Sequence, residues 1–341
     1  MRSADRRIGL KSLWPVMLII TLLCIPGLLY AGQEITQSLG LKAGWNAVYL
    51  EIGPAEADPD IIFSGTPVTQ ALTFYPKNSP VQFIQDPAET LWEKSGWSRW
   101  VPADRPEALL KNLFALQANQ PYLLYSTAAH TLQLTGTPVF RKKRWQPDSF
   151  NFVGFHADET APPTLAQFFE NSRAHAGLHV YYLHSSQWLR VADPSAVNIA
   201  AGQAYWVWCQ GGSDHQGPME IGLPGIGDGL NFLAAVDELE IEVTNRSPNP
   251  LTFTLESVSG NEVPLSLVKS VITEETVVTY EPFTSYSPEI LLESGEKHEV
   301  RLAVRRKDIT ADEVTGLLKI TDDLGDCYYS FQQKDCPECE N

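Results

Sequence analysis

Residues 44–225 contain the same series of short motifs twice. The matched segments are GWNAVYL (44–50) with FNFVGF (150–155), WSR (97–99) with WLR (188–190), ANQPY (118–122) with AGQAY (201–205), and LQLTGTP (132–138) with MEIGLPG (219–225). Four matches in one order indicate a duplication, and self-similarity at this period is typical of repeated structural units. The chain is therefore expected to fold, over this range, as two copies of one module.

The two copies differ in length between their first and second matched segments. The first copy is longer, which places an insertion at about residues 76–92. Insertions are accommodated in surface loops, because a buried loop would leave backbone polar groups unpaired. We therefore expect the insertion to lie outside the shared framework.

The matched segments resemble strands in composition and pattern. WNAVYLEI, HVYYL and AYWVWC are alternating or short apolar runs that are rich in aromatic and β-branched residues. The segment 163–172 is the best candidate for a helix, with Leu165, Phe168 and Phe169 on one side, and 57–65 is its counterpart in the first copy. Each copy is therefore predicted to be a β-rich module with one small helix.

After a glycine-rich joint at 222–229 the pattern changes to alternating strands separated by frequent turns. Strands are expected in 239–257 on both sides of an Asn/Ser/Pro turn, in 298–306, and as a hairpin in 315–331 around the turn at 322–325. Such alternation is typical of an antiparallel sandwich. The predicted fold class is mainly β, with two repeated modules and a C-terminal immunoglobulin-like β-sandwich.

These motifs support two resemblances. The repeat resembles a β-rich module of exported and surface proteins of bacteria, in which a GWN strand opens the unit and a GxxYWV strand lies near its end. This resemblance covers about residues 38–225. The second copy departs at Phe150, and the first departs at Asn119 and Leu123. Residues 229–322 resemble immunoglobulin-like domains of the spindle-protein and sperm-protein type, with Leu233 in place of the expected glycine. The first family implies export and architecture without an activity, and the second implies a spacer or adhesion module.

The first 31 residues have a basic start, a long apolar run and a small-residue end at Ala31, which is the pattern of a secretory signal peptide. An uncleaved anchor is the alternative, because Leu13 to Leu29 approaches the length that spans a bilayer. The expected location is the periplasm or the cell surface. The expected boundaries are 1–31 for the signal, 32–139 and 140–226 for the modules, and 227–341 for the sandwich with its cysteine-containing tail.

The formal net charge of −16 makes nucleic acid a poor partner, because an acidic surface repels a phosphate backbone. The expected partners are envelope or surface proteins and glycans, and the membrane is reached only through the N-terminal segment if it is not cleaved. One basic run stands against this background, RKKR at 141–144 between the two copies. It is interpreted as the solvated face of a linker.

Four cysteines follow the signal segment, namely Cys209, Cys327, Cys336 and Cys339. An even number of cysteines in an exported chain favours disulfides. A CPEC spacing also occurs in redox sites, but those open a helix beside a βαβ sheet, and a zinc site needs four ligands. A bridge from Cys327 to Cys336 or Cys339 is the favoured interpretation. Cys209 is then free, paired with the remaining cysteine, or available to another chain.

Aromatic residues that recur at matched positions of the two copies are expected to fill equivalent places in the module cores. These are Trp45, Trp97, Trp188 and Tyr205. Trp92, Trp100 and Trp208 have no tryptophan counterpart in the other copy, so they are the candidates for an exposed ligand-binding surface. Asn46 and Asn151 also recur and are expected to satisfy backbone groups of a turn.

No catalytic motif, cofactor-binding loop or complete metal-ligand set is recognised in the sequence, and calcium at the acidic turn 322–326 is a minor alternative. The expected function is therefore non-catalytic, as a structural or protein-binding component of the bacterial envelope or surface. The alternatives are a carbohydrate-binding protein that uses exposed tryptophans, and a hydrolase with a cleft between the modules.

Overall fold

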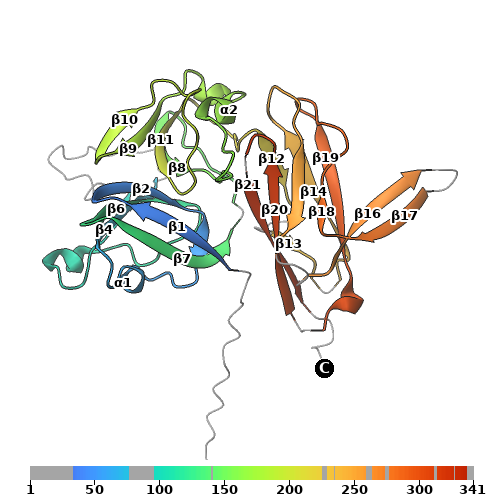
Figure 1. The fold of residues 1–341 in the computed structure, drawn as a ribbon, viewed down its shortest axis with the longest axis horizontal. Helices are drawn as coiled ribbons and strands as arrows, with labels where there is room; N and C mark the ends of the chain where they lie inside the picture. Colours follow the sequence, from blue (N-terminus) through green and yellow to red (C-terminus); the bar gives the residue numbers. More distant parts are fainter. Residues whose placement is uncertain are drawn as a thin grey trace, which may run out of the picture. The chain divides into compact units, whose positions relative to one another are not determined.

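The computed structural model describes residues 34–76, 96–139, 141–224, 229–233, 235–258, 263–272, 276–310, 313–325 and 327–335, and for 271–272, 276, 313 and 327–335 it describes the backbone alone. The expected signal peptide lies outside these residues. Gly32–Asn341 forms one compact unit. The fold is mainly β and is built from several antiparallel sheets, as predicted (Figure 1).

The first copy contains a four-stranded antiparallel sheet in the order β2-β6-β4-β5, and a three-stranded sheet in the order β1-β7-β3. Its strands are β1 (Ile35–Leu41), β2 (Gly44–Leu50), β3 (Ile52–Pro54), β4 (Val68–Phe74), β5 (Trp97–Trp100), β6 (Gln120–Ser126) and β7 (His130–Pro138). A short 3-10 helix, η2 (Pro106–Leu110), precedes β6. The apolar side of these sheets encloses one core, which includes Leu50, Ile52 and Tyr122.

The second copy repeats the four-stranded sheet in the order β8-β11-β9-β10. The strands are β8 (Ser149–Gly154), β9 (Val180–His184), β10 (Gln187–Arg190) and β11 (Ala204–Cys209), with η3 (Arg173–His175) before β9. Each strand takes the place of its sequence counterpart in the first copy, which supports the duplication. The β4–β5 connection, residues 75–96, is longer than the β9–β10 connection, Ser185 and Ser186, so the insertion separates two strands as expected.

Each copy has the one short helix that its sequence predicted. In the second copy α2 (Leu165–Phe169) begins at Thr164, whose hydroxyl accepts from the Gln167 backbone while the Gln167 side chain accepts from the Thr164 backbone. This reciprocal capping box satisfies two donors that a helix start otherwise leaves unpaired. In the first copy α1 (Pro59–Ile62) is capped by Asp58.

The C-terminal part is a two-sheet β-sandwich, as predicted. One sheet has the order β12-β14-β19-β16-β17 and the other β13-β21-β20-β15-β18. The strands are β12 (Met219–Gly222), β13 (Gly229–Asn231), β14 (Glu238–Asn245), β15 (Phe253–Ser257), β16 (Leu265–Ile272), β17 (Thr276–Pro282), β18 (Ser285–Tyr286), β19 (Lys297–Val304), β20 (Glu313–Asp322) and β21 (Cys327–Asp335), with η4 (Arg306–Asp308) after β19. The core between the sheets includes Phe232, Phe253 and Leu302.

Two connections of the sandwich differ from the simplest expectation. The strands on either side of the Asn/Ser/Pro turn, β14 and β15, lie in different sheets instead of forming a hairpin. Asn245 explains the crossing, because its buried amide donates to the carbonyls of Asn249 and Leu292 and its oxygen accepts from Ser247 N. The predicted closing strand of the second copy, β12, pairs with β14, so that it extends a sandwich sheet.

Candidate functional site: two equivalent grooves between the repeated modules

The four-stranded sheets of the two copies pack against each other through equivalent faces. Their contact cluster contains buried Ala47, Tyr49, Phe152 and Ala204 and the partly buried Phe74, Leu123, Leu183, Trp188 and Trp206. Trp97 joins it, with its ring 6.4 Å from that of Phe152 and 6.3 Å from that of Trp206. Four pairs of matched positions thus meet here, namely 47 with 152, 74 with 183, 97 with 188 and 123 with 206.

This interface corrects the role expected for the recurring tryptophans. Tyr205 is a core residue, at 1% exposed, but Trp45, Trp97 and Trp188 are only partly buried. Trp97 and Trp188 lie on the sheet face that meets the other copy, opposite the module core. A residue can therefore recur in both copies because the copies bind each other, and not only because each fills the same core position.

The recurring asparagines hold the turn that opens each copy, as expected. Asn46 Oδ1 accepts from Lys42 N at 2.9 Å, and its amide donates to the carbonyls of Lys42 and Gly44. Asn151 Oδ1 likewise accepts from Gln146 N at 2.7 Å, and its amide donates to the carbonyls of Gln146 and Ser149. These bonds fix the start of β2 and β8, the strands that line the grooves described next.

Two grooves lie where the opening strand of one copy meets the loop before β6 or β11 of the other. The larger, with a volume of about 730 Å³, is called the basic groove; it is lined by Tyr49, Phe74, Pro76, 119–121, 141–144, Gln146, 150–154 and Leu223. The smaller, with a volume of about 470 Å³, is called the twin groove; it is lined by 38–40, Lys42, Ala43, 45–48, 183–186 and 201–203.

The two grooves are built from matched segments. Residues 150–153 in the basic groove correspond to 45–48 in the twin groove, and Asn119 and Gln120 correspond to Gly202 and Gln203. Asn119 and Gly202 share the left-handed conformation, with φ of 57° and 70°. The duplication therefore provides the protein with two related binding-site frames that differ in their side chains.

A half-exposed aromatic pair lies beside each groove. Trp45 and Tyr125 meet edge to face with ring centroids 5.2 Å apart, and the matched residues Phe150 and Trp208 do so at 5.1 Å. Phe150 is 38% exposed, and Tyr181 contacts its ring at 5.6 Å. Phe150, Trp208 and Tyr181 thus form an aromatic row beside the basic groove, and all three residues are at least partly exposed.

A polar network next to the basic groove ties the copies together. His156 Nε2 lies 2.6 Å from Asn119 Oδ1, Tyr49 OH donates to the same oxygen at 3.1 Å, and His156 Nδ1 lies 3.6 Å from Glu51 Oε2. Glu51 Oε1 also accepts from Gly202 N at 3.0 Å. Burial, aided by the Glu51 carboxylate, raises the pKa of Tyr49 well above its usual value, so the phenol stays protonated.

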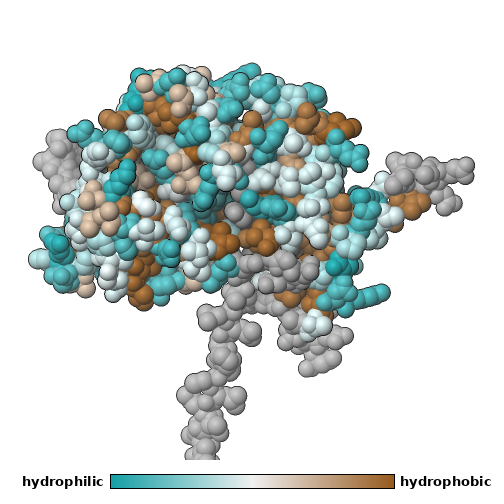
Figure 2. Space-filling view, in the orientation of Figure 1, coloured by the Kyte–Doolittle hydropathy of each residue, from teal (hydrophilic) through white to brown (hydrophobic). Residues whose placement is uncertain are grey.

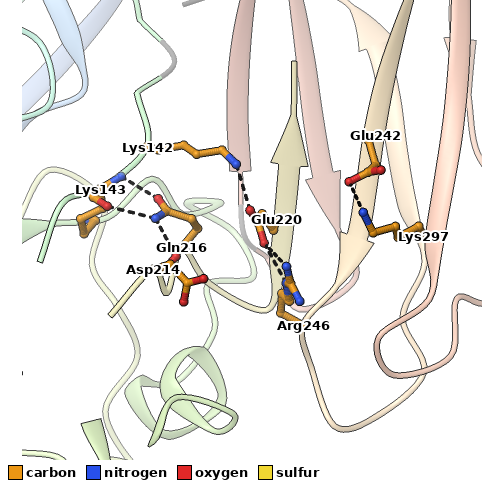
Figure 3. Close-up of polar contacts among 8 residues, drawn as sticks. All are labelled: Lys142, Lys143, Asp214, Gln216, Glu220, Glu242, Arg246 and Lys297. Carbon is orange, nitrogen blue, oxygen red and sulfur yellow. Dashed lines mark hydrogen bonds and ion pairs between the residues drawn. The ribbon is translucent and has the colours of Figure 1, made fainter. Parts of the chain in front are cut away.

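The two central lysines of the basic run make specific contacts, whereas the arginines at its ends are exposed. Lys142 Nζ pairs with Glu220 Oε1 at 2.9 Å, and Arg246 holds the other oxygen of that carboxylate at 2.6 Å (Figure 3). The Lys143 ammonium donates to the Gly154 carbonyl and lies 4.1 Å from the centroid of the Phe155 ring. Arg141 and Arg144 are exposed, and in the described part of the chain neither is paired with a carboxylate.

Gln216 fixes the backbone of the same run. Its side-chain oxygen accepts from Lys143 N at 2.6 Å, and its amide donates to the carbonyls of Lys143 and Asp214 (Figure 3). The expectation of a solvated linker face therefore holds for Arg141, Arg144 and the exposed but paired Lys142, and does not hold for the partly buried Lys143.

The three tryptophans expected at a surface have different outcomes in the structure. Trp92 lies outside the described residues. Trp100 is only 3% exposed; it packs on Phe63 at 4.8 Å and donates to Asp60 Oδ1 at 2.7 Å. The prediction that Trp100 lies at an exposed binding surface is therefore wrong, because its indole N–H is hydrogen-bonded within the first copy. Trp208 is partly buried beside Phe150, and the absence of a tryptophan counterpart in the first copy gives no indication of this partner.

The cysteines are described only in part. Cys209 is a free, buried thiol whose Sγ lies 3.4 Å from the Gly211 carbonyl oxygen, and burial raises its pKa. Cys327 begins β21, but its side chain and the whole of Cys336 and Cys339 lie outside what is described. The expected bridge in the tail stays a prediction.

The acidic turn after β20 makes a structural contact with the second copy. Asp322 is 7% exposed and its Oδ1 accepts from Leu324 N at 3.1 Å, while the Gly325 carbonyl accepts from Asp158 N at 2.8 Å. No cluster of three or more metal-ligating side chains occurs among the described residues. In the same residues no helix is long and apolar enough to cross a membrane.

Comparison with known proteins adds little to this geometry. No protein-family profile and no curated protein matches the chain. Among solved structures, a PapD-like domain of human CEP192 is 13% identical, covering 36% of this chain and 87% of that one, with a TM-score of 0.23. A FixG-related protein from Vibrio parahaemolyticus is 14% identical over 35% of this chain and 97% of that one, again with a TM-score of 0.23. With TM-scores this low, neither similarity bears on fold or function.

Proposed function

We propose that the protein is an exported, non-catalytic binding component of the bacterial envelope or cell surface, and that the grooves between the repeated modules are its binding sites. The observation that carries the proposal is the use of equivalent sheet faces to join the two copies. This packing buries matched positions of the two copies and leaves two grooves that share a frame and differ in several of their side chains.

The polar groups beside the basic groove support a binding role over a catalytic one. Tyr49 is 4% exposed, and its hydroxyl is already bonded to Asn119, which also contacts His156. A catalytic base or nucleophile must instead be able to reach its substrate. These residues hold the modules together and shape the groove, with no free reactive atom aimed into it.

The sandwich supports the same role, because it is joined to the second copy by several contacts. β12 leaves that copy and enters a sandwich sheet, Glu220 on β12 links Lys142 to Arg246, and the Asn171 amide donates to the Arg246 carbonyl at 2.8 Å. A sandwich joined to the second copy in this way suits a component that presents a binding groove.

Binding without turnover is the direct test. The fragment 32–341 is applied to a glycan array and to isolated envelope polymers, and any bound polymer is recovered and compared by mass spectrometry with untreated polymer. The proposal expects retention of an unchanged ligand. A shortened or chemically altered ligand would contradict it and favour the hydrolase alternative.

Carbohydrate binding is the second candidate, and the aromatic row of Phe150, Tyr181 and Trp208 favours it. Aromatic rings with one exposed edge or face provide apolar area together with little loss of conformational freedom. Trp208→Ala is therefore expected to weaken retention on a glycan that the native protein binds. Trp100→Phe is the control, because that ring lies in the core and does not reach the row.

A further inference from the structure

The basic groove differs from the rest of this acidic protein in the charge of its lining. Its described lining residues include four cations, 141–144, and the amides of Asn119, Gln120 and Gln146, and none of them is Asp or Glu. The whole chain carries 41 acidic and 25 basic residues. A concave site lined by one sign of charge attracts ligands of the opposite charge more strongly than a flat surface does.

The contacts of the run leave two of its cations available. Lys142 is paired with Glu220, and the ammonium of Lys143 is bound to a carbonyl and lies over an aromatic ring. These contacts of the two lysines hold the backbone of the run in place. The hydrogen bonds between Gln216 and the Lys143 backbone do the same. Arg141 and Arg144 flank this fixed pair, so both guanidinium groups are presented from an ordered segment.

The comparison with the twin groove isolates this feature. The twin groove has the same frame, but its described lining contains Lys42 as its one Lys or Arg residue, with no run of cations. The positive lining is therefore specific to the second copy and is not a consequence of how the modules pack. A feature added to one of two equivalent frames indicates a ligand that only this frame accepts.

We propose that the basic groove binds an acidic polysaccharide, with Arg141 and Arg144 pairing with carboxylates of the chain and the row of Phe150, Tyr181 and Trp208 contacting its sugar rings. Guanidinium groups bind carboxylates through two parallel hydrogen bonds. The aromatic row lies at the end of the same groove, where Phe150 belongs to both the groove lining and the row. This inference rests on the proposed binding function and names its ligand class.

Polygalacturonate, a polymer with one carboxylate on each sugar, is the probe, and dextran is its neutral counterpart. Binding of both to fragment 32–341 is measured by isothermal titration calorimetry at low and at physiological salt. We expect binding of polygalacturonate that weakens with salt, and no binding of dextran. The double variant R141Q/R144Q is expected to bind at least tenfold more weakly. R141K/R144K should retain part of the affinity, because lysine keeps the positive charge but cannot form the two parallel hydrogen bonds of a guanidinium group.

Lys307→Gln, at an exposed lysine of the sandwich that lines neither groove, is the control and is expected to leave the affinity unchanged. Both arginines are exposed, so circular dichroism should show an intact fold for every variant. The proposal would be overturned if Lys307→Gln weakened binding and R141Q/R144Q did not, or if the protein failed to bind polygalacturonate. Equal affinity for DNA or polyphosphate would also overturn it, because charge alone would then explain the binding.

The same experiment distinguishes this inference from the function on which it rests. If the protein binds a neutral glycan and R141Q/R144Q binds it equally well, the acidic ligand is wrong while the binding function stands. If the protein instead releases shortened polygalacturonate, the non-catalytic function fails together with the inference.

Discussion

At the scale of single residues, the side chains that recur in both copies fall into two groups with different tasks. Asn46 and Asn151 bind backbone atoms of the opening turn, and the hydroxyls of Tyr122 and Tyr205 accept from the backbone five residues earlier, at 2.8 Å and 3.0 Å. These groups keep each copy in shape. The recurring tryptophans of β5 and β10 instead join the copies.

Asn151→Ala is expected to lower the free energy of unfolding by about 2–3 kcal/mol, because it leaves a buried donor and two carbonyls without their partner. Asn46→Ala is expected to cost less, since Asn46 is partly exposed and water can replace its amide. Urea unfolding of both variants checks the comparison. An equal loss in the two variants would contradict the burial-based explanation.

Stability is expected to decline in mild acid. Burial, together with the nearby His215 and Lys143, lowers the pKa of His175 to about 4, and burial lowers that of His215 to about 4. Both are neutral in the folded protein near pH 6, whereas the unfolded chain takes up protons from about pH 6.5 downwards. The free energy of unfolding should therefore fall between about pH 6.5 and pH 4, by up to about 1.4 kcal/mol per pH unit for each histidine.

The measurement is urea unfolding at a series of pH values, with His215→Gln as the variant. A glutamine keeps a donor for the Phe168 carbonyl, which His215 Nε2 contacts at 2.8 Å, but it does not titrate. The pH dependence should be about half as steep in this variant. A variant with the native slope would show that these histidines are not the groups responsible.

At the scale of elements, the positions of many strands along the chain followed from the sequence, whereas the partners of those strands did not. The repeat predicted matched strands and one helix in each copy, and these are present. The pairing of β12 with β14 was not predictable, because the pattern of MEIGLPG indicates a strand without naming its neighbour. Edge strands with an unpaired side can join either domain, and the contacts with β14 decide the outcome.

The β16–β17 hairpin shows the same limit. Only Leu265–Leu267 of β16 pair with β19, and the remainder pairs with β17 alone. Beyond this point the two strands form an arm that carries hydrophobic residues on its surface (Figure 2), including the exposed Val277, Val278 and Tyr280. Neither strand is among those that the sequence pattern predicted, so this arm became apparent only in the structure.

The contact of β8 with β2 depends on a glycine that no turn requires. A Cβ at Gly154 would lie 2.0 Å from Cγ of the buried Tyr49 ring, whereas one at Gly40 would meet nothing within 4 Å. Gly154→Ala is therefore expected to loosen the interface between the copies and to speed proteolysis between them. Limited proteolysis beside Gly40→Ala, which should behave as the native protein, tests this. Equal resistance of both variants would contradict the packing described here.

At the scale of the whole molecule, the sequence predicted a fold class and a set of domains but not how the domains join. The apolar character of Phe152, Trp206 and Trp97 predicts that they are buried in some contact. Nothing in their spacing shows that this contact lies between the two copies. The basic run could be recognised, yet the partners of Lys142 and Lys143 lie 78 and 11 residues away and became apparent only with the fold. For the same reason the contact between Phe150 and Trp208 could not be predicted from the sequence.

Glu220→Gln tests the joint between the second copy and the sandwich. Glu220 is half-buried and bridges two cations, so its loss is expected to lower stability by about 1–2 kcal/mol, since partly buried charge-assisted bonds are stronger than exposed ones (Figure 3). Glu242→Gln is the matched control, because the Glu242–Lys297 pair is more exposed and should contribute less than about 0.5 kcal/mol. Thermal unfolding of both variants gives the comparison. A larger drop in the unfolding temperature for Glu242→Gln than for Glu220→Gln would contradict this explanation.

Hydrogen–deuterium exchange of fragment 32–341 with and without polygalacturonate would show directly whether the ligand binds in the basic groove. We expect slower exchange in peptides that cover 118–121 and 141–146, the two segments that meet in the basic groove, with no change in 183–186 of the twin groove. Protection confined to the β16–β17 arm, or equal protection of both grooves, would contradict it.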